Sequence, residues 1–142
     1  MKILLTAINA KYIHSNLAVY NLRAYAAHYA KGMTASDTVE IGEYTINNQM
    51  EDILEGIYKA KPDVLMFSCY IWNIAYVEEL AEEFHKLRPE VPIWVGGPEV
   101  SYETESFLRC HPQITGVMIG EGEKTFCELA EYYAGESRRD KE

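Results

Sequence analysis

The sequence has no long uninterrupted apolar run and few cysteines. Its apolar stretches, such as Val64 to Phe67, are far shorter than the ~20 residues of a membrane-spanning helix, and no basic-then-apolar leader opens the chain. The three cysteines, Cys69, Cys110 and Cys127, include no Cys-x-x-Cys pair. This spacing argues against a zinc knuckle, an iron–sulfur site held by this chain and a disulfide framework. We therefore expect a protein of the reducing cytoplasm with no membrane partner.

Basic residues are also scarce. The 13 lysines and arginines are outnumbered by 22 aspartates and glutamates, which gives a formal net charge of -9. A basic cluster occurs only in the tail, at Arg138, Arg139 and Lys141. Nonspecific affinity for DNA or RNA requires many phosphate-neutralising cations. The composition therefore argues against a nucleic-acid partner.

The chain instead alternates short apolar runs with helical patterns over a length that fits one domain. Strands are predicted at 2–8, 38–44, 63–68, 91–95 and 114–119, each followed by a helix. Four helices are expected to follow the N-caps Ser15, Asn48, Asn73 and Ser101, and the fifth covers 123–133. The first helix should bury Ala18, Leu22, Tyr25 and Tyr29. Residues 135–142 are charged and unpatterned, which predicts a tail or the start of a linker after a domain at 1–134.

Strand–helix alternation predicts a doubly wound α/β fold, with a parallel sheet and helices on both faces. The first and third strands are apolar throughout, whereas the second alternates apolar and polar residues as an edge strand does. We therefore expect a five-stranded parallel sheet of order 2-1-3-4-5, a Rossmann-like or flavodoxin-like arrangement. Such a sheet binds its ligand outside the carboxyl ends of the strands, where the winding reverses between strands one and three.

The loops at this edge exclude several ligand classes. The first, Asn9 to Asn16, has no glycine, so it offers no close backbone approach to the phosphates of a dinucleotide or a nucleoside triphosphate. A phosphate-accepting receiver needs an acidic cluster after strand one and an aspartate after strand three. This chain has Asn9 and Lys11 at the first place, and Ser68 with Cys69 at the second. Phosphoryl transfer to the chain is therefore not expected.

Glycine pairs follow strands four and five. Gly96-Gly97 removes two side chains and leaves room for a bulky ligand, although a sharp turn explains the pair equally well. The segment Gly120 to Glu123 offers the same two interpretations, a ligand-facing loop or a tight turn before a helix. Aromatic residues gather in the same loops, at Tyr12, Tyr70, Trp72 and Tyr102. They suit either an enclosed ligand or a docked partner.

Two residues at this edge carry possible chemistry. His14 is either a surface histidine or a metal ligand, and no carboxylate nearby in sequence orients its ring. Cys69 has no adjacent base in sequence to make it a nucleophile. We interpret it, with Cys110 and Cys127, as a small buried apolar residue.

Four loop segments together resemble a known family. They are Asn9 to Asn16 (NAKYIHSN), Ser68 to Asn73 (SCYIWN), Gly96 to Tyr102 (GGPEVSY) and Gly120 to Phe126 (GEGEKTF). Over residues 1–134 the chain resembles the amino-terminal cobalamin-binding domain of cobalamin-dependent (class B) radical S-adenosylmethionine (SAM) proteins, many of them methyltransferase-like. The resemblance implies a module that positions cobalamin for methyl transfer in a larger enzyme.

The resemblance also implies which residues bind cobalamin. Ser68 matches a serine that contacts the nucleotide tail, Gly96 and Gly97 match a glycine pair lining the tail channel, and Gly120 to Glu123 match the flanking segment. The full predicted set is Asn9, Ala10, Lys11, Tyr12, His14, Ser68, Cys69, Tyr70, Gly96, Gly97, Pro98, Glu99, Gly120, Glu121, Gly122 and Glu123. On this interpretation Gly97→Ala weakens cobalamin retention while leaving the melting temperature of the cofactor-free protein almost unchanged.

Two departures from the family pattern limit the chemistry of this chain. The Asp-x-His-x-x-Gly signature of domains that bind cobalt through histidine is absent around His14, so we expect cobalamin without a histidine ligand and no metal ligand from this chain. The Cys-x-x-x-Cys-x-x-Cys of the four-iron cluster is absent as well. We expect the iron–sulfur cluster and SAM in a radical SAM catalytic domain elsewhere in the same longer polypeptide, and no catalytic residue here.

Two other functions remain open from the sequence. The chain is alternatively an interaction domain of the same fold that binds no cofactor and docks its aromatic edge on a neighbouring catalytic domain. A small-molecule enzyme with Cys69 as nucleophile is the third possibility. Retention of cobalamin separates the first two.

Overall fold

The computed structural model describes residues 1–9, 17–69, 73–97, 104–119 and 122–139. The strands are β1 (Lys2–Asn9), β2 (Thr38–Thr45), β3 (Val64–Ser68), β4 (Ile93–Gly96) and β5 (Gly116–Met118). The helices are α1 (Leu17–Tyr29), α2 (Met50–Ala60), α3 (Ile74–Leu87), α4 (Thr104–Cys110) and α5 (Glu123–Arg139). Ser15 and Ser101, two of the expected helix caps, lie outside the described residues.

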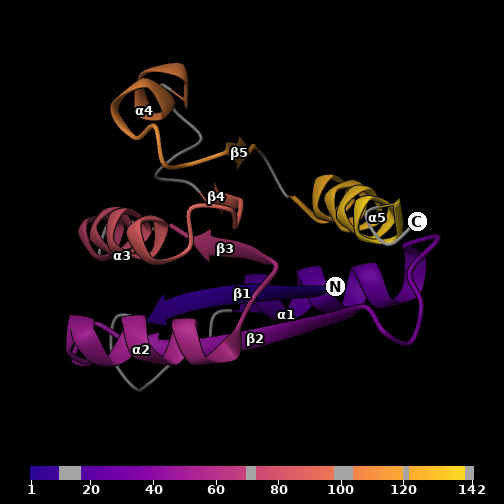
Figure 1. Ribbon diagram of the computed structural model, residues 1–142, viewed down its shortest axis with the longest axis horizontal. Coiled ribbons are helices and arrows are strands. Elements are labelled where there is room, and N and C mark those ends of the chain that lie inside the picture. The colour runs from indigo at the N-terminus through magenta and orange to yellow at the C-terminus, as the bar shows by residue number, and fades with distance from the viewer. Residues whose placement is uncertain (10–16, 70–72, 98–103, 120–121, 140–142) are drawn as a thin grey trace.

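The strands form one parallel sheet in the order β2-β1-β3-β4-β5, as predicted (Figure 1). In β1 and β3 buried residues follow one another, because helices cover both faces of these central strands. Along β2 exposed residues are interspersed with partly buried ones, as expected for an edge strand. The winding reverses between β1 and β3, so the edge formed by their carboxyl ends is the expected ligand site.

Two hydrophobic cores sandwich the sheet. α1 and α5 pack together over one face and bury Val19, Leu22 and Phe126 against it. α2 and α3 cover the other face with residues such as Ile53, Ile57 and Phe84. Each fully buried side chain of this size contributes roughly 1.5–3 kcal/mol relative to exposure. These two layers hold the central strands, and therefore the carboxyl edge, in place.

The described ends of the chain and helix α4 lie away from this arrangement. Both ends are on the side of the sheet where β1 begins, opposite the carboxyl edge (Figure 1). α4 contributes no buried residue and stands apart from the other helices (Figure 1). No helix within the described ranges combines the length and the apolar character needed to cross a bilayer.

The buried face of α1 differs from the prediction. Val19, Leu22 and Ala26 are buried, whereas Tyr29, which was expected to point inward, is 56% exposed. The small and branched side chains let the helix approach the sheet closely, and a tyrosine hydroxyl is better solvated at the surface. The expected stripe is therefore rotated by about one residue.

Two expected helix ends are also corrected. Asn48 does not cap α2, because the helix begins after Gln49, and the Asn48 Oδ1 accepts a bond from the Thr45 amide at 2.7 Å. α5 continues to Arg139, so residues 135–139 of the predicted tail are helical. A single glycine inside a helix costs only about 1 kcal/mol, and the residues around Gly135 are mostly good helix formers. Residues 140–142 lie outside the described part.

Candidate cofactor site at the carboxyl edge

A row of small residues crosses the carboxyl edge of the sheet. Ala7, Ser68 and Gly96 are register partners on β1, β3 and β4, and Met118 of β5 continues the row. Ala7 and Met118 belong to the core under α1 and α5. Register partners point to the same face, so Ser68 and Gly96 face these helices too. The row carries little side-chain bulk where the winding reverses, which suits the insertion of a slender ligand group.

The structure brings part of the predicted site together. The Cys69 amide donates to the Gly96 carbonyl at 2.6 Å, which joins the loops after β3 and β4. Asn9 lies on the β2 side of this cluster, where its carbonyl accepts a bond from the Ile46 amide at 2.9 Å. Gly122 and Glu123 start α5. The remaining predicted residues lie outside the described part: Ala10, Lys11, Tyr12, His14, Tyr70, Pro98, Glu99, Gly120 and Glu121.

Gly97 has a structural requirement for glycine. Its φ is 116°, and a Cβ at this position would lie 2.3 Å from the carbonyl oxygen of Cys69. Both the positive φ and the contact exclude alanine unless the backbone moves. The expectation that Gly97→Ala leaves stability almost unchanged is therefore wrong. The role of Gly97 in cobalamin binding stays a prediction.

Gly96 tolerates a side chain better than Gly97 does. It is not among the described glycines with a positive φ. A Cβ there would meet the Met118 side chain, at 3.3 Å from Cε and 3.5 Å from Cβ. Methionine is flexible, so this neighbour gives way at small cost. A methyl group at Gly96 therefore adds bulk to the small-residue row without breaking the turn.

The second glycine segment is built as a helix start. Gly122 has a φ of 83°, and its carbonyl accepts the Phe126 amide at 2.6 Å. Its Cβ position is open, with Leu22 of α1 the nearest neighbour at 3.7 Å. Glu123 stands in the first turn of α5, where a carboxylate stabilises the positive end of the helix dipole. The turn interpretation accounts for both residues, and their contact with a cofactor stays a prediction.

The cysteines separate into two groups. Cys69 is fully buried in the core under α2 and α3, which confirms its interpretation as a small apolar residue. Cys127 is buried as well, and burial together with the nearby Glu131 carboxylate raises the pKa of its thiol. Cys110 is exposed at the end of α4, so its interpretation as buried is wrong. α4 contributes no buried residue, and Cys110 is its last residue.

Two residues at this edge escaped the sequence-based prediction. Asn73 was expected to cap α3, but its side chain makes no capping bond and donates instead to β1 and β3. Its residue type and its place before a helix favour the cap, so no sequence signal indicates the other role. Ile119 follows β5 at the same edge and is 59% exposed. An isoleucine at the end of an apolar run is expected to be buried in the core. The sequence does not show that β5 ends before this residue.

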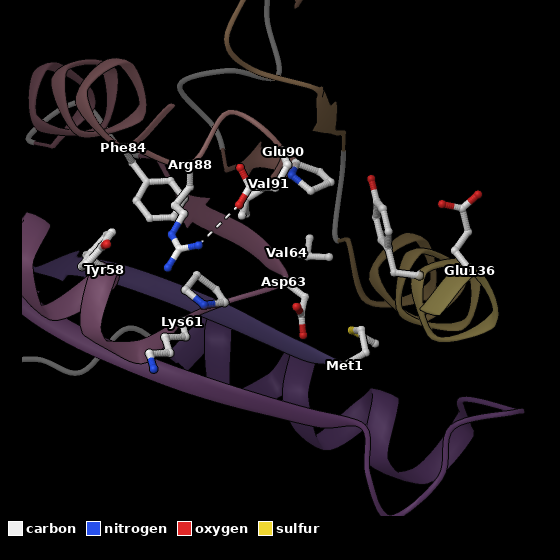
Figure 2. Close-up of a pocket in the computed structure, with 13 residues that line it drawn as sticks. Met1, Tyr58, Lys61, Asp63, Val64, Phe84, Arg88, Glu90, Val91 and Glu136 are labelled. Carbon is white, nitrogen blue, oxygen red and sulfur yellow. Dashed lines mark ion pairs between the residues drawn. The ribbon is translucent and has the colours of Figure 1, made fainter. Parts of the chain in front are cut away.

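One hollow of the surface lies away from this row. A cavity of about 440 Å3 opens near the amino ends of the strands, between the ends of α2 and α3 and the later part of α5 (Figure 2). Arg88 extends across it, 3.6 Å from the Glu90 carboxylate and 5.1 Å from the Tyr58 ring centroid. Within the described residues no three His, Cys, Asp or Glu side chains are grouped to hold a metal ion.

The fold and the small-residue row define a doubly wound domain of the kind that binds a ligand at the carboxyl edge of its sheet. The family model described as "B12 binding domain" matches residues 3–130. The chain belongs to this B12-binding domain family.

Two curated relatives are much longer proteins. The cobalamin-dependent radical SAM methyltransferase TokK of Streptomyces tokunonensis is 35% identical over 80 residues, which cover 56% of this chain and 12% of that protein. The 2-(S-pantetheinyl)-carbapenam-3-carboxylate methyltransferase of Streptantibioticus cattleyicolor is 37% identical over 68 residues, or 48% of this chain and 10% of that protein. The matched stretch is thus a small part of either relative.

Solved structures share the fold. The apo cobalamin-dependent S-adenosylmethionine radical enzyme OxsB superposes with a TM-score of 0.70 at 18% identity, covering 95% of this chain and 19% of that one. A CheY-like protein, TadZ of Pseudomonas aeruginosa PAO1, gives a TM-score of 0.54 at 16% identity, covering 86% and 92% of the two chains. At these identities the likeness concerns the fold alone.

Proposed function

We propose that this domain binds cobalamin at the carboxyl edge of its sheet and positions it for methyl transfer. Membership of the B12-binding family carries the proposal. The row of Ala7, Ser68 and Gly96 supports the location, because it places small side chains at the switch point on the face of α1 and α5. The predicted loop residues would surround the cofactor there. Cobalamin, when bound, supplies the methyl-carrying chemistry.

The cofactor binds without a histidine ligand from this chain. The sequence has Tyr12 two positions before His14 and Leu17 three positions after it, where the histidine-ligating signature has aspartate and glycine. The domain's own contribution is then a binding surface, with no residue acting on the reacting atoms.

The domain acts as one part of a longer polypeptide. In the two curated relatives the matched stretch is 12% and 10% of the protein, and one of them is a cobalamin-dependent radical SAM methyltransferase by name. We assign the iron–sulfur cluster and SAM to a catalytic domain of that kind. The cofactor-binding unit spans residues 1–134, which includes the whole family match.

A retention experiment tests this function. The 142-residue chain is mixed with hydroxocobalamin and desalted, and the visible spectrum of the protein fraction is recorded. The wild type is expected to keep cobalamin. Gly96→Ala, which adds a methyl group to the small-residue row, is expected to keep several-fold less.

Gly42→Ala is the matched control. It adds the same methyl group to β2. The atoms nearest to the new Cβ belong to Tyr44, at 3.5 Å, and to Leu4, at 3.6 Å, and both are ordinary van der Waals distances. This variant is expected to keep as much cobalamin as the wild type. A wild-type chain that elutes colourless supports the cofactor-free interaction domain instead. If Gly96→Ala and Gly42→Ala keep equal amounts of cobalamin, the small-residue row is not part of the binding site.

A further inference from the structure

Asn73 is a polar side chain with no exposed surface at the carboxyl edge. Its Nδ2 donates to the Ile8 carbonyl at 3.0 Å and to the Ser68 carbonyl at 2.9 Å. Ile8 belongs to β1 and Ser68 to β3, the two strands between which the winding reverses. One amide group thus joins these strands at their carboxyl ends.

The two bonds stand where the regular ladder stops. The pairing of β1 with β3 ends at Ala7 and Ser68, and the bond from the Cys69 amide to the Gly96 carbonyl continues the connection to β4. The segments 10–16 and 70–72, which hold predicted site residues, follow β1 and Cys69 directly in sequence. The Asn73 bonds thus fix the strand ends to which these segments are joined.

A capping role does not account for this residue. Asn73 precedes α3, yet its side chain makes no capping bond to the first turn. A buried amide is costly unless its donors are bonded, and here the NH2 group reaches two different strands. Aspartate has the same shape without the two donors, and alanine has neither the shape nor the donors.

We infer that Asn73 is a positioning residue, which holds the ends of β1 and β3 at the spacing that cobalamin binding requires. The inference rests on the proposed function. Without the bridge, the binding-competent arrangement of the edge is less populated, and the apparent dissociation constant rises by the same factor. A fall of the competent fraction to one tenth weakens binding about tenfold.

The test compares Asn73→Ala with a core variant of equal stability. Ile57→Ala removes a fully buried side chain from α2 without touching the carboxyl edge, and Ile57→Val is used if the melting temperature matches better. Each chain is titrated with hydroxocobalamin. Asn73→Ala is expected to bind about tenfold more weakly, through slower association. The Ile57 variant is expected to bind like the wild type.

Asn73→Asp gives a second readout if Asn73→Ala does not fold. An aspartate facing two carbonyl groups is protonated more readily, and the protonated form donates one hydrogen bond. Its affinity for cobalamin is therefore expected to recover as the pH falls from about 8 to about 5, while the wild type changes little. A purely structural role predicts that only the melting temperature recovers at low pH, with no change in the affinity of the folded chain.

The outcomes separate this inference from the proposed function. If the wild type binds cobalamin and the Asn73 variants bind equally well, the positioning role is wrong and the function stands. If the Ile57 variant loses as much affinity as Asn73→Ala, or if Asn73→Asp shows no recovery at low pH, the positioning role is also wrong. If the wild type does not bind cobalamin, the proposed function and this inference fall together.

Discussion

Replacing Gly97 by alanine is expected to destabilise the cofactor-free domain strongly. A φ of 116° costs a residue with a Cβ about 1–2 kcal/mol, and the Cβ would lie 2.3 Å from the Cys69 carbonyl oxygen. That oxygen is backbone and cannot rotate away, so the loops after β3 and β4 must separate. Together the two effects cost about 2–4 kcal/mol.

Two other glycines calibrate this estimate. Gly122 also has a positive φ, but the nearest atom to its Cβ position is 3.7 Å away, so Gly122→Ala should cost only the conformational strain of about 1–2 kcal/mol. Gly96→Ala should stay within about 1 kcal/mol of the wild type, because the gain from a less flexible unfolded chain offsets the contact with Met118. Stability is therefore expected to fall least for Gly96→Ala and most for Gly97→Ala.

Thermal unfolding of the cofactor-free chain measures this order. For a domain of this size a loss of 2–4 kcal/mol lowers the melting temperature by about 5–15 °C. Circular dichroism at one protein concentration is sufficient, with all three variants and the wild type in the same buffer. A Gly97→Ala variant that melts within about 1 °C of the wild type would refute the reasoning. It would show that the two loops are not held together as the backbone contact implies.

Four further outcomes are expected. His14→Ala leaves the absorption spectrum of bound cobalamin unchanged, and a clear shift in that spectrum would indicate a histidine ligand. In the native chain Cys110 reacts rapidly with a thiol reagent, while Cys69 and Cys127 react after unfolding. Rapid modification of all three cysteines at neutral pH would contradict this burial. Burial also raises the pKa of the Cys127 thiol above its ordinary value. The neutral thiol therefore favours the folded state at neutral pH, and this contribution to stability is lost as the pH rises through the raised pKa. Arg88→Ala changes stability by less than about 1 kcal/mol, because the ion pair of Arg88 with Glu90 is partly exposed. It leaves cobalamin retention intact, because the cavity that Arg88 lines is at the opposite edge of the sheet. Lower retention would place the cofactor elsewhere.

The order of the strands was predictable because a strand buried on both faces and a strand buried on one face have different patterns of apolar residues in the sequence. β1 and β3 are apolar in consecutive positions, which only a strand covered on both sides tolerates. β2 alternates, so it belongs at an edge. The switch point between β1 and β3 was predictable from the same reasoning, and the binding of a ligand there stays a prediction.

The details of the site depend on contacts that sequence patterns do not carry. Asn73 looks like a helix cap, and the choice between a cap and a bridge is made by carbonyl groups of β1 and β3 that are distant in sequence. Gly97 looks like an open position, yet the Cys69 backbone fills the space beside it. Cys110 looks like Cys127, and the difference lies in whether its helix is covered.

The amino and carboxyl edges of the sheet differ in what lies at them. The described ends of the chain lie on the amino side of the sheet, opposite the carboxyl edge (Figure 1). At that edge the described residues offer small side chains, backbone hydrogen bonds and one buried amide, while the thiol closest to the row is sealed in the core. On the proposed function, we expect this edge to hold the cofactor by shape. On that function we also expect loss of Asn73 and added bulk at Gly96 to lower cofactor affinity, and of the two changes only Gly96→Ala to leave the fold largely intact.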